Sequence, residues 1–287
     1  MIKERLPAEH LLDQQKNNLR RKTIFLIVLA LSILLMVSIS GLLIKPENLT
    51  TDFTNKNMAP SFAHLFGTDW LGRDLLLRTV KGLSLSIFIG MFACAIGIVI
   101  AVILGLMSAT MGKRVDSLIC FFIDLFLSTP HILMIIIICF AVGGGLKGVV
   151  IGIAVTHWAS LARIVRAEVK QVLTQEYVHI ARNFGKSRIY IAINHIFPPL
   201  LPILLVGFIS TFPHALLHEA SITFLGFGLS PHEPAIGIIL SESMKYLAAG
   251  YWWLAALPGL SLLLIVLLFD VLGENVKKLI HPKMIHS

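Results

Sequence analysis

The chain has 287 residues, of which 56% are hydrophobic and only 14% are charged, and its formal net charge at pH 7 is +8. A soluble domain of this size could not bury that much apolar surface and still present a charged exterior, so an ordinary soluble protein is excluded. The positive charge does not indicate a nucleic-acid partner, because the basic residues flank long apolar blocks, as membrane topology requires.

Six apolar blocks are long enough to cross a hydrocarbon core about 30 Å thick as helices, at 1.5 Å per residue. They cover residues 24–44, 83–109, 118–142, 144–161, 198–217 and 251–272. Backbone groups in lipid must be satisfied within the segment, so the sequence predicts an all-α polytopic membrane protein with about six transmembrane helices. Pro130 predicts a kink in the third of them.

The distribution of basic residues predicts the orientation. With a cytoplasmic N-terminus, 17 of the 24 Lys and Arg residues fall on the cytoplasmic side, so we expect both termini there. The first apolar run is too long for a signal-peptide core and is expected to remain as an anchor. The predicted segments are a cytoplasmic tail 1–22, an anchor 23–45, an extracytoplasmic segment 46–82, a core transmembrane domain 83–275 with a cytoplasmic loop 162–197, and a cytoplasmic tail 276–287.

Small residues recur at every fourth position in two of the predicted spans. They are Ala93, Gly97, Ala101, Gly105 and Ala109 in the second span, and Gly144, Gly148, Gly152, Thr156 and Ser160 in the fourth. Such stripes let helix backbones approach closely in a membrane. They fit either an interface that slides during gating or static packing of the bundle.

Acidic residues inside membrane spans are costly and are often functional. Asp124 lies within the third span and Glu219 follows the fifth, so both are candidates for a translocation path or gate. For Asp124 the alternative is a structural hydrogen bond.

The sequence contains none of the common catalytic or nucleotide-binding motifs. The sequence lacks a Walker A motif, whose backbone amides and lysine would hold a nucleotide's phosphates, and it lacks H-E-x-x-H and G-x-S-x-G. The three cysteines lie in apolar segments without a C-x-x-C pair, and the eleven histidines are scattered. We therefore expect no enzyme activity and no catalytic, cofactor or metal site, and any energy for transport must come from a partner or an ion gradient.

The cytoplasmic loop 162–197 has its own helical pattern. Tyr177, Ile180, Ala181 and Phe184 fall on one face of a short helix, and Gly185 is a natural stop for it. Ser187 can cap a second helix, which is expected to end before Pro198. A short amphipathic helix facing the cytoplasm suits a groove on a partner protein, although it could also lie on the membrane surface.

This loop resembles the EAA loop of ATP-binding-cassette (ABC) importer permeases, in the form found in the dipeptide, oligopeptide and nickel group. The matching positions are Glu176, Tyr177, Val178, Ala181, Arg182, Gly185, His195, Ile196 and Pro198. Three further stretches resemble the same group in the same order, at residues 64–74, at 219–228, and at 252–282 with His281-Pro282 near its end. Ile236-Gly237 departs from the usual Trp-Gly of the group.

The resemblance implies a type I permease of the C-type, working with several partners. These would be a homologous second permease, two ATPase subunits that hydrolyse ATP with Mg²⁺, and an extracytoplasmic solute-binding protein. The chain itself would lie in the cell membrane. The ATPase-coupling residues would be Glu176, Tyr177, Ala181, Arg182, Gly185 and Pro198. The stretch from Glu219 to Gly228 would lie toward the external gate.

Two local matches bear on the solute. His157 within Thr-His-Trp-Ala, and His218 after Leu217, resemble the nickel branch of the group, and a histidine can ligate nickel. A lone helical histidine, however, is more often a hydrogen-bonded structural residue. The expected solute is therefore nickel or a metal chelate, or else a di- or oligopeptide. The alternative functions are an ion-gradient-driven secondary transporter and a membrane scaffold subunit without a path.

Overall fold

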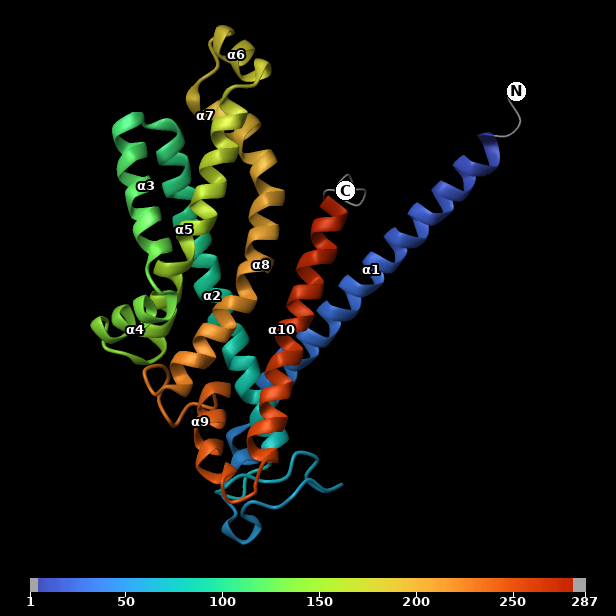
Figure 1. Cartoon of the computed structure of the whole chain (residues 1–287), viewed down its shortest axis with the longest axis vertical. Coiled ribbons are helices and arrows are strands. Elements are labelled where there is room, and N and C mark those ends of the chain that lie inside the picture. The colour runs from blue at the N-terminus through green and yellow to red at the C-terminus, as the bar shows by residue number, and fades with distance from the viewer. Residues whose placement is uncertain (1–4, 281–287) are drawn as a thin grey trace.

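The computed structural model describes residues 5–280, and within that range all regular secondary structure is helical (Figure 1). Residues 1–4 and the tail motif His281-Pro282 lie outside the described residues. The α-helices are α1 (Arg5–Leu43), α2 (Leu75–Thr110), α3 (Lys113–Ser128), α4 (His131–Ala141), α5 (Gly145–Leu173), α6 (Glu176–Asn183), α7 (Arg188–Ile191), α8 (Phe197–Phe224), α9 (Ile236–Leu247) and α10 (Trp253–Ile280). Two short 3₁₀ turns (Pro46–Leu49 and Phe53–Asn55) and one π-helical turn (Ala192–Ile196) complete the list.

Within the described residues, five helical segments are long and apolar enough to cross a membrane, and there are six if the bent pair α3–α4 is counted as one span. The sequence predicted one kinked span there, but the two helices meet at 104°. The cause is local, because Thr129 is extended (φ −89°, ψ 140°), the conformation that a following proline favours. The third span is therefore a broken helix, and α4 turns away from the bundle axis (Figure 1).

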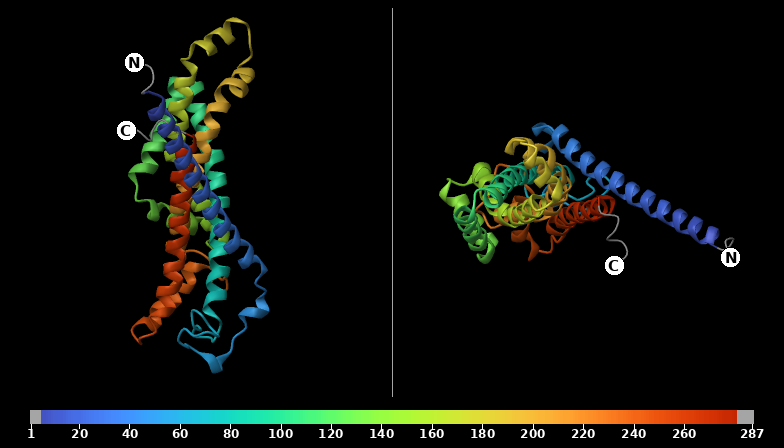
Figure 2. Two further views of the ribbon diagram at one scale, coloured as in Figure 1. Left: turned by 90° about the vertical axis from the view of Figure 1, so that its right-hand side faces the viewer. Right: turned by 90° about the horizontal axis from the view of Figure 1, so that it is seen from above.

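The ends of the helices agree with the predicted orientation. The first turns of α1 and the last turns of α10 lie toward the same end of the molecule as α6 (Figures 1 and 2). The segment before α2 and helix α9 lie at the opposite end. If α6 is cytoplasmic, both chain ends are cytoplasmic as well. Helix α9 is too short to span a membrane, and the spans predicted from sequence did not include it.

The predicted small-residue stripes are sites of close helix packing. A Cβ added to Gly105 of α2 would lie 2.7 Å from Cγ1 of Val165 on α5. The stripe of α5 faces α4, where a Cβ on Gly148 would lie 2.8 Å from the carbonyl oxygen of Cys139. The glycines therefore bring α2, α5 and α4 together backbone to backbone, as expected for membrane helices.

The apolar core forms two clusters. The larger one joins α1, α2, α4, α5, α8, α9 and α10 around Phe212, whose ring centroid lies 3.9 Å from that of Phe269. The second joins α3, α5 and the start of α8, and it also takes in Val178 and Ala181 of α6. The second cluster therefore fixes α6 to the inner end of α5.

Helix α1 contributes little to this core. Only Ala30 and Leu34 of its membrane-length segment are buried among the hydrophobic residues, and the helix diverges from the bundle toward its N-terminal end (Figure 2). Near its C-terminal end it contacts α2 closely, where the Ser84 hydroxyl donates to the carbonyl oxygen of Ser38 at 2.8 Å. The remaining apolar surface of α1 is left for lipid or another subunit.

Candidate functional site

A cavity of about 580 Å³ lies between α5 and α8. Helix α8 provides half of its lining at helical spacing: Ile203, Val206, Gly207, Ser210, Thr211, His214 and His218. The rest comes from Leu127 of α3, His131 of α4, four residues of α5 (His157, Ser160, Leu161 and Ile164) and Lys277 of α10. Ile203 and His218 are about 22 Å apart along one helix at 1.5 Å per residue, so the cavity follows α8 through much of the membrane.

A few polar side chains interrupt the otherwise apolar lining of this cavity. The hydroxyl of Ser210 is buried and has no hydrogen-bond partner among the described residues. Gly207 lets the Leu161 side chain of α5 pack directly against the backbone of α8, because a Cβ at Gly207 would lie 2.7 Å from Cδ1 of Leu161. A buried polar atom without a partner is costly, so such a wall suits a polar solute or water.

Three histidines meet at one end of the cavity. His131 of α4, His157 of α5 and His218 of α8 each offer one possible ligand atom, and these atoms lie within 4.8 Å of one another. The sequence pointed to His157 and His218 separately but did not connect them, and it missed His131 and His214. The scattered histidines thus include a set that the fold gathers from three helices.

The two acidic candidates do not line this cavity. The Asp124 carboxylate accepts a hydrogen bond from the Arg163 guanidinium at 2.6 Å, and both side chains are largely exposed. Glu219 is completely buried and accepts a hydrogen bond from the Thr223 hydroxyl at 3.0 Å, one turn further along α8. The structure therefore pairs Asp124 and buries Glu219 within the bundle, and neither residue lines the cavity.

At the other end of α5, the short helix α6 has the predicted cap. Gly185 has φ +69°, and the Lys186 amide donates to the Ala181 carbonyl at 3.1 Å, closing the helix in a Schellman arrangement. Ser187 caps the next helix as predicted, its hydroxyl accepting from the Tyr190 amide at 3.1 Å. Glu176 and Arg182 are exposed on this helix.

The predicted apolar face of α6 needs one correction. Tyr177, Ile180 and Phe184 are exposed, but Ala181 is buried together with Val178 against α5. The helix has two apolar sides because Val178 and Ala181 are three residues apart and turn toward the bundle. The exposed apolar surface of α6 therefore consists of Tyr177, Ile180 and Phe184.

The helix after α6 does not end before Pro198, contrary to the sequence-based prediction. A π-helical turn, Ala192–Ile196, joins α7 to α8 and places Pro198 in the first turn of α8. Proline is tolerated there because first-turn amides have no partner within the helix. The wider turn accommodates the two prolines without a break between the loop and the fifth span.

A polar cluster that the sequence did not reveal joins the cytoplasmic ends of α2, α3 and α5. The carboxylate of Asp116 accepts from the Arg166 guanidinium at 2.5 and 2.8 Å and from the Lys170 ammonium at 2.6 Å. It also accepts from the Ser108 hydroxyl at 2.6 Å. These contacts hold α3 on the inner half of α5, from which α6 extends.

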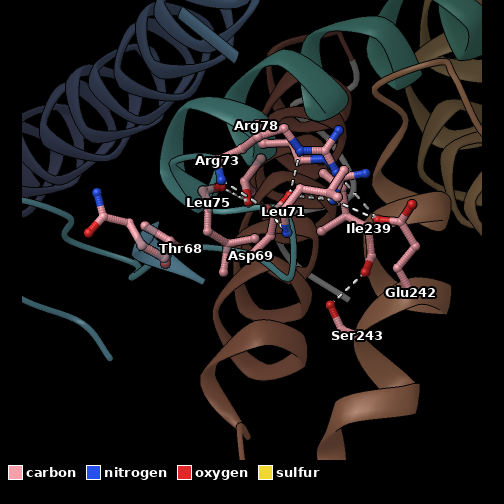
Figure 3. Close-up of polar contacts among 11 residues, drawn as sticks. Thr68, Asp69, Leu71, Arg73, Leu75, Arg78, Ile239, Glu242 and Ser243 are labelled. Atoms are coloured by element: carbon pink, nitrogen blue, oxygen red, sulfur yellow. Dashed lines mark hydrogen bonds and ion pairs between the residues drawn. The ribbon is translucent and has the colours of Figure 1, made fainter. Parts of the chain in front are cut away.

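A second network lies on the opposite side of the membrane (Figure 3). The buried Asp69 carboxylate accepts from Nε of Arg73 at 2.7 Å and from the Arg78 guanidinium at 3.0 Å. Arg78 also forms an ion pair with Glu242 of α9 at 2.6 Å. The stretch before α2 is therefore tied to both α2 and α9.

Backbone geometry explains the glycines of this stretch. Gly67 and Gly72 have φ of +75° and +78°, and a Cβ on Gly72 would lie 1.7 Å from the Asp52 carbonyl oxygen. Asp74 caps α2 by accepting from the Leu77 amide, and its carboxylate lies 2.8 Å from Nδ1 of His64. The motif at residues 64–74 is thus a compact cap over the outer end of α2.

A bundle of membrane-spanning helices with a cavity that follows one helix and carries several polar side chains is the architecture of a membrane transport subunit. The model of one family, the binding-protein-dependent transport system inner membrane component, matches residues 97–286. The chain belongs to this family.

Curated relatives extend the match over nearly the whole chain. The dipeptide transport system permease protein DppC of Bacillus subtilis is 30% identical over 94% of this chain and 83% of its own length. The oligopeptide transport system permease protein OppC of the same organism is 32% identical over 94% and 87%. The probable D,D-dipeptide transport system permease protein DdpC of Escherichia coli is 31% identical over 89% and 86%.

Solved structures support the fold. A chain of the MetNI methionine ABC transporter in an inward-facing form aligns with a TM-score of 0.56 at 18% identity, over 70% of this chain and 95% of that one. A chain of an amino acid ABC transporter aligns with a TM-score of 0.55, also at 18% identity, over 69% and 91%. This protein is a multi-pass cell-membrane permease subunit of an ABC importer.

Proposed function

We propose that this chain forms one half of a translocation pore, pairing with a homologous second permease. Two ATPase subunits bind the cytoplasmic face and a solute-binding protein binds the outer face. The splayed, exposed α1 supports a further subunit beside it. The chain itself binds no nucleotide, and ATP and Mg²⁺ are used by the ATPases.

Helix α6 is proposed as the element that couples ATP hydrolysis to movement of the spans. The proposed coupling surface consists of Tyr177, Ile180 and Phe184, which are exposed on α6. Helix α6 follows the inner end of α5, which is itself a membrane span. Glu176 and Arg182 flank this surface, and Gly185 and Pro198 set the turn and the re-entry into α8. Closure of the ATPases would move α6, and α5 and α8 would carry that motion to the cavity.

The external gate is proposed at the outer end of α8, between Glu219 and Gly228. Leu225 and Gly226 form a tight turn after α8, closed by the Phe227 amide, which donates to the Ile222 carbonyl at 3.0 Å. The Phe227 carbonyl accepts from the thiol of Cys139 on α4 at 3.1 Å. The turn therefore touches the broken third span, so a shift of α4 would reach it.

The solute that the cavity suits best is a metal ion carried by a small chelator. The observation that carries this choice is the presence of four histidines, His131, His157, His214 and His218, among the lining residues. Imidazole is a favoured ligand for nickel and neighbouring metals. A cavity that binds an uncharged part of a peptide does not need several histidines.

Di- or oligopeptides are the second candidate, because the named relatives are permeases of dipeptide and oligopeptide transport systems. Lys277 at the inner end of the cavity could pair with a peptide carboxylate. Both candidate solutes are small and polar, and both carry several hydrogen-bond donor and acceptor groups.

The test is uptake by cells with and without this gene, offered radioactive nickel, nickel with peptide-like chelators, and labelled dipeptides in parallel. Loss of chelated nickel uptake alone supports the metal-bearing solute. Loss of dipeptide uptake alone replaces it with the second candidate. Normal uptake of all three would contradict a role in importing either class.

A further inference from the structure

We propose that His131, His157 and His218 form a coordination site for a divalent first-row transition metal ion in transit. The inference rests on the proposed function, because it specifies where a metal-bearing solute contacts the permease. It adds that the permease itself supplies ligands to the metal, rather than accommodating the chelate by shape alone.

The three rings come from three different helices and converge on one point. The ring centroids are 4.5 Å apart for His131 and His157, 5.2 Å for His131 and His218, and 5.4 Å for His157 and His218. The His131 and His218 rings are nearly parallel, whereas His157 meets them edge-on. Three imidazoles so arranged can each turn a nitrogen toward a common centre.

Hydrogen bonding prepares one of the ligands. Nδ1 of His157 lies 3.0 Å from the carbonyl oxygen of Ile153 on the same helix. A carbonyl can only accept, so Nδ1 carries the proton and Nε2 of the neutral ring keeps its lone pair for a metal. A backbone carbonyl that fixes the tautomer of a ligating histidine is a common feature of metal sites.

One nitrogen of His131 also lacks a competing partner. Nδ1 of His131 is buried and has no hydrogen-bond partner among the described residues. Within the same part of the chain, no hydrogen bond joins two of the three rings. A structural role alone would leave Nδ1 of His131 unsatisfied, whereas one metal ion would satisfy a nitrogen on each ring.

The geometry favours exchange over permanent retention. Metal–nitrogen bonds of about 2.0–2.1 Å place tetrahedral ligand nitrogens roughly 3.4 Å apart, so rings whose nitrogens lie up to 4.8 Å apart must close by up to about 1.4 Å. His131 follows the Thr129-Pro130 break directly, so it can shift without deforming a continuous helix. Three protein ligands also leave a fourth position for a donor atom of the chelator.

A path leads away from the site along one face of α8. His214 lies one turn from His218 and lines the same cavity, followed by Ser210 and Thr211 toward the inner end. Transport requires that each binding step be weak enough to release the ion, and an open three-ligand site with a neighbouring imidazole meets that condition.

The direct test uses the assembled transporter, purified with its second permease and ATPases, and Co²⁺ alone as the probe. Cobalt in a nitrogen-rich tetrahedral site absorbs visible light, so a titration reports both ligation and stoichiometry. We expect a saturable visible band at one Co²⁺ per copy of this chain. Absence of the band in the natural protein overturns the inference without any variant.

Variants locate the ligands. His157→Ala and His218→Gln are each expected to weaken Co²⁺ binding by about tenfold or more. The matched control is His232→Ala, which removes an exposed histidine of the loop between α8 and α9 and should leave binding unchanged. Equal Co²⁺ affinity in His218→Gln, His131→Gln and the natural protein would contradict the site.

Uptake measurements separate this inference from the proposed function. If cells need the gene for chelated nickel but the purified transporter gives no cobalt band, the metal stays within its chelator and only the site is wrong. If the band is present but only dipeptide uptake depends on the gene, the site stands and the proposed solute is wrong.

Discussion

The guanidinium of Arg78 on α2 and the carboxylate of Glu242 on α9 form an ion pair at 2.6 Å, and the Arg78 side chain is only 5% exposed. Arg78 also binds Asp69, so one side chain holds the outer segment, α2 and α9 together (Figure 3). The arginine is thus the centre of the extracytoplasmic network.

Arg78→Ala is expected to destabilise the outer half of the permease by about 1.5–3 kcal/mol, because the buried Asp69 carboxylate loses one of its two guanidinium partners and keeps Arg73. Thermal unfolding of the detergent-purified protein measures the effect. Glu242→Gln retains a polar group of the same size and should cost less. Equal melting temperatures for Arg78→Ala and the natural protein would show that the network contributes little to stability.

Gly237→Ala is expected to loosen the contact between α9 and α8. The added Cβ would lie 2.4 Å from the carbonyl oxygen of Ala220, and backbone atoms cannot move aside as a flexible side chain can. Overpacking of this kind costs about 1–3 kcal/mol. The measurement is again the melting temperature of the purified protein.

Gly259→Ala on α10 is the matched control for Gly237→Ala. The nearest atom to its added Cβ is Cδ2 of Leu240 at 3.7 Å, an ordinary contact. Alanine favours helix over glycine, so this variant should be neutral or more stable. If both alanine variants melted alike, close approach at Gly237 would not be limiting.

How far the sequence predicted this site depends on whether a feature is local. The cap at Gly185 and the turn at Ser187 were predicted correctly because each depends on neighbouring backbone groups. The cluster of His131, His157 and His218 could not be predicted, because its members lie on three helices. Their rotation about each helix axis is set by tertiary packing, including the close approach of α4 to the glycines of α5.

The same distinction applies to α6. Helical spacing predicted an apolar face containing Ala181, but that spacing cannot tell which of two apolar sides meets the bundle. The structure buries Val178 and Ala181 and leaves Phe184 exposed, because α6 packs against the inner end of α5. Likewise, Arg78 and Glu242 gave no local signal, since they meet only when α9 folds over the outer end of α2.

Phe184→Asp is expected to reduce ATP-driven uptake at least tenfold by removing part of the coupling surface. Phe184 is 79% exposed, so its replacement should change the stability of the permease by no more than about 0.5 kcal/mol. Co-purification of the ATPase subunits with the membrane-inserted permease measures the lost contact. The control is Phe53→Asp, the same change at an exposed aromatic residue on the opposite side of the membrane. If the Phe184→Asp variant still co-purified with the ATPases, Phe184 would not be part of the surface that binds them.

Gly185→Val is expected to impair coupling through the backbone alone. Nothing lies within 4 Å of a Cβ added to Gly185, so a side chain has room, but φ is +69°. A residue with a Cβ pays about 1–2 kcal/mol in this left-handed conformation, and a β-branched one is a clear outlier there. Asparagine tolerates it far better, so Gly185→Asn should retain most of the uptake that Gly185→Val loses. Because the two variants add side chains of comparable size, a difference in uptake at equal membrane abundance reports the turn after α6. Equal uptake by Gly185→Val and the natural protein would mean that the orientation of α6 does not depend on this turn.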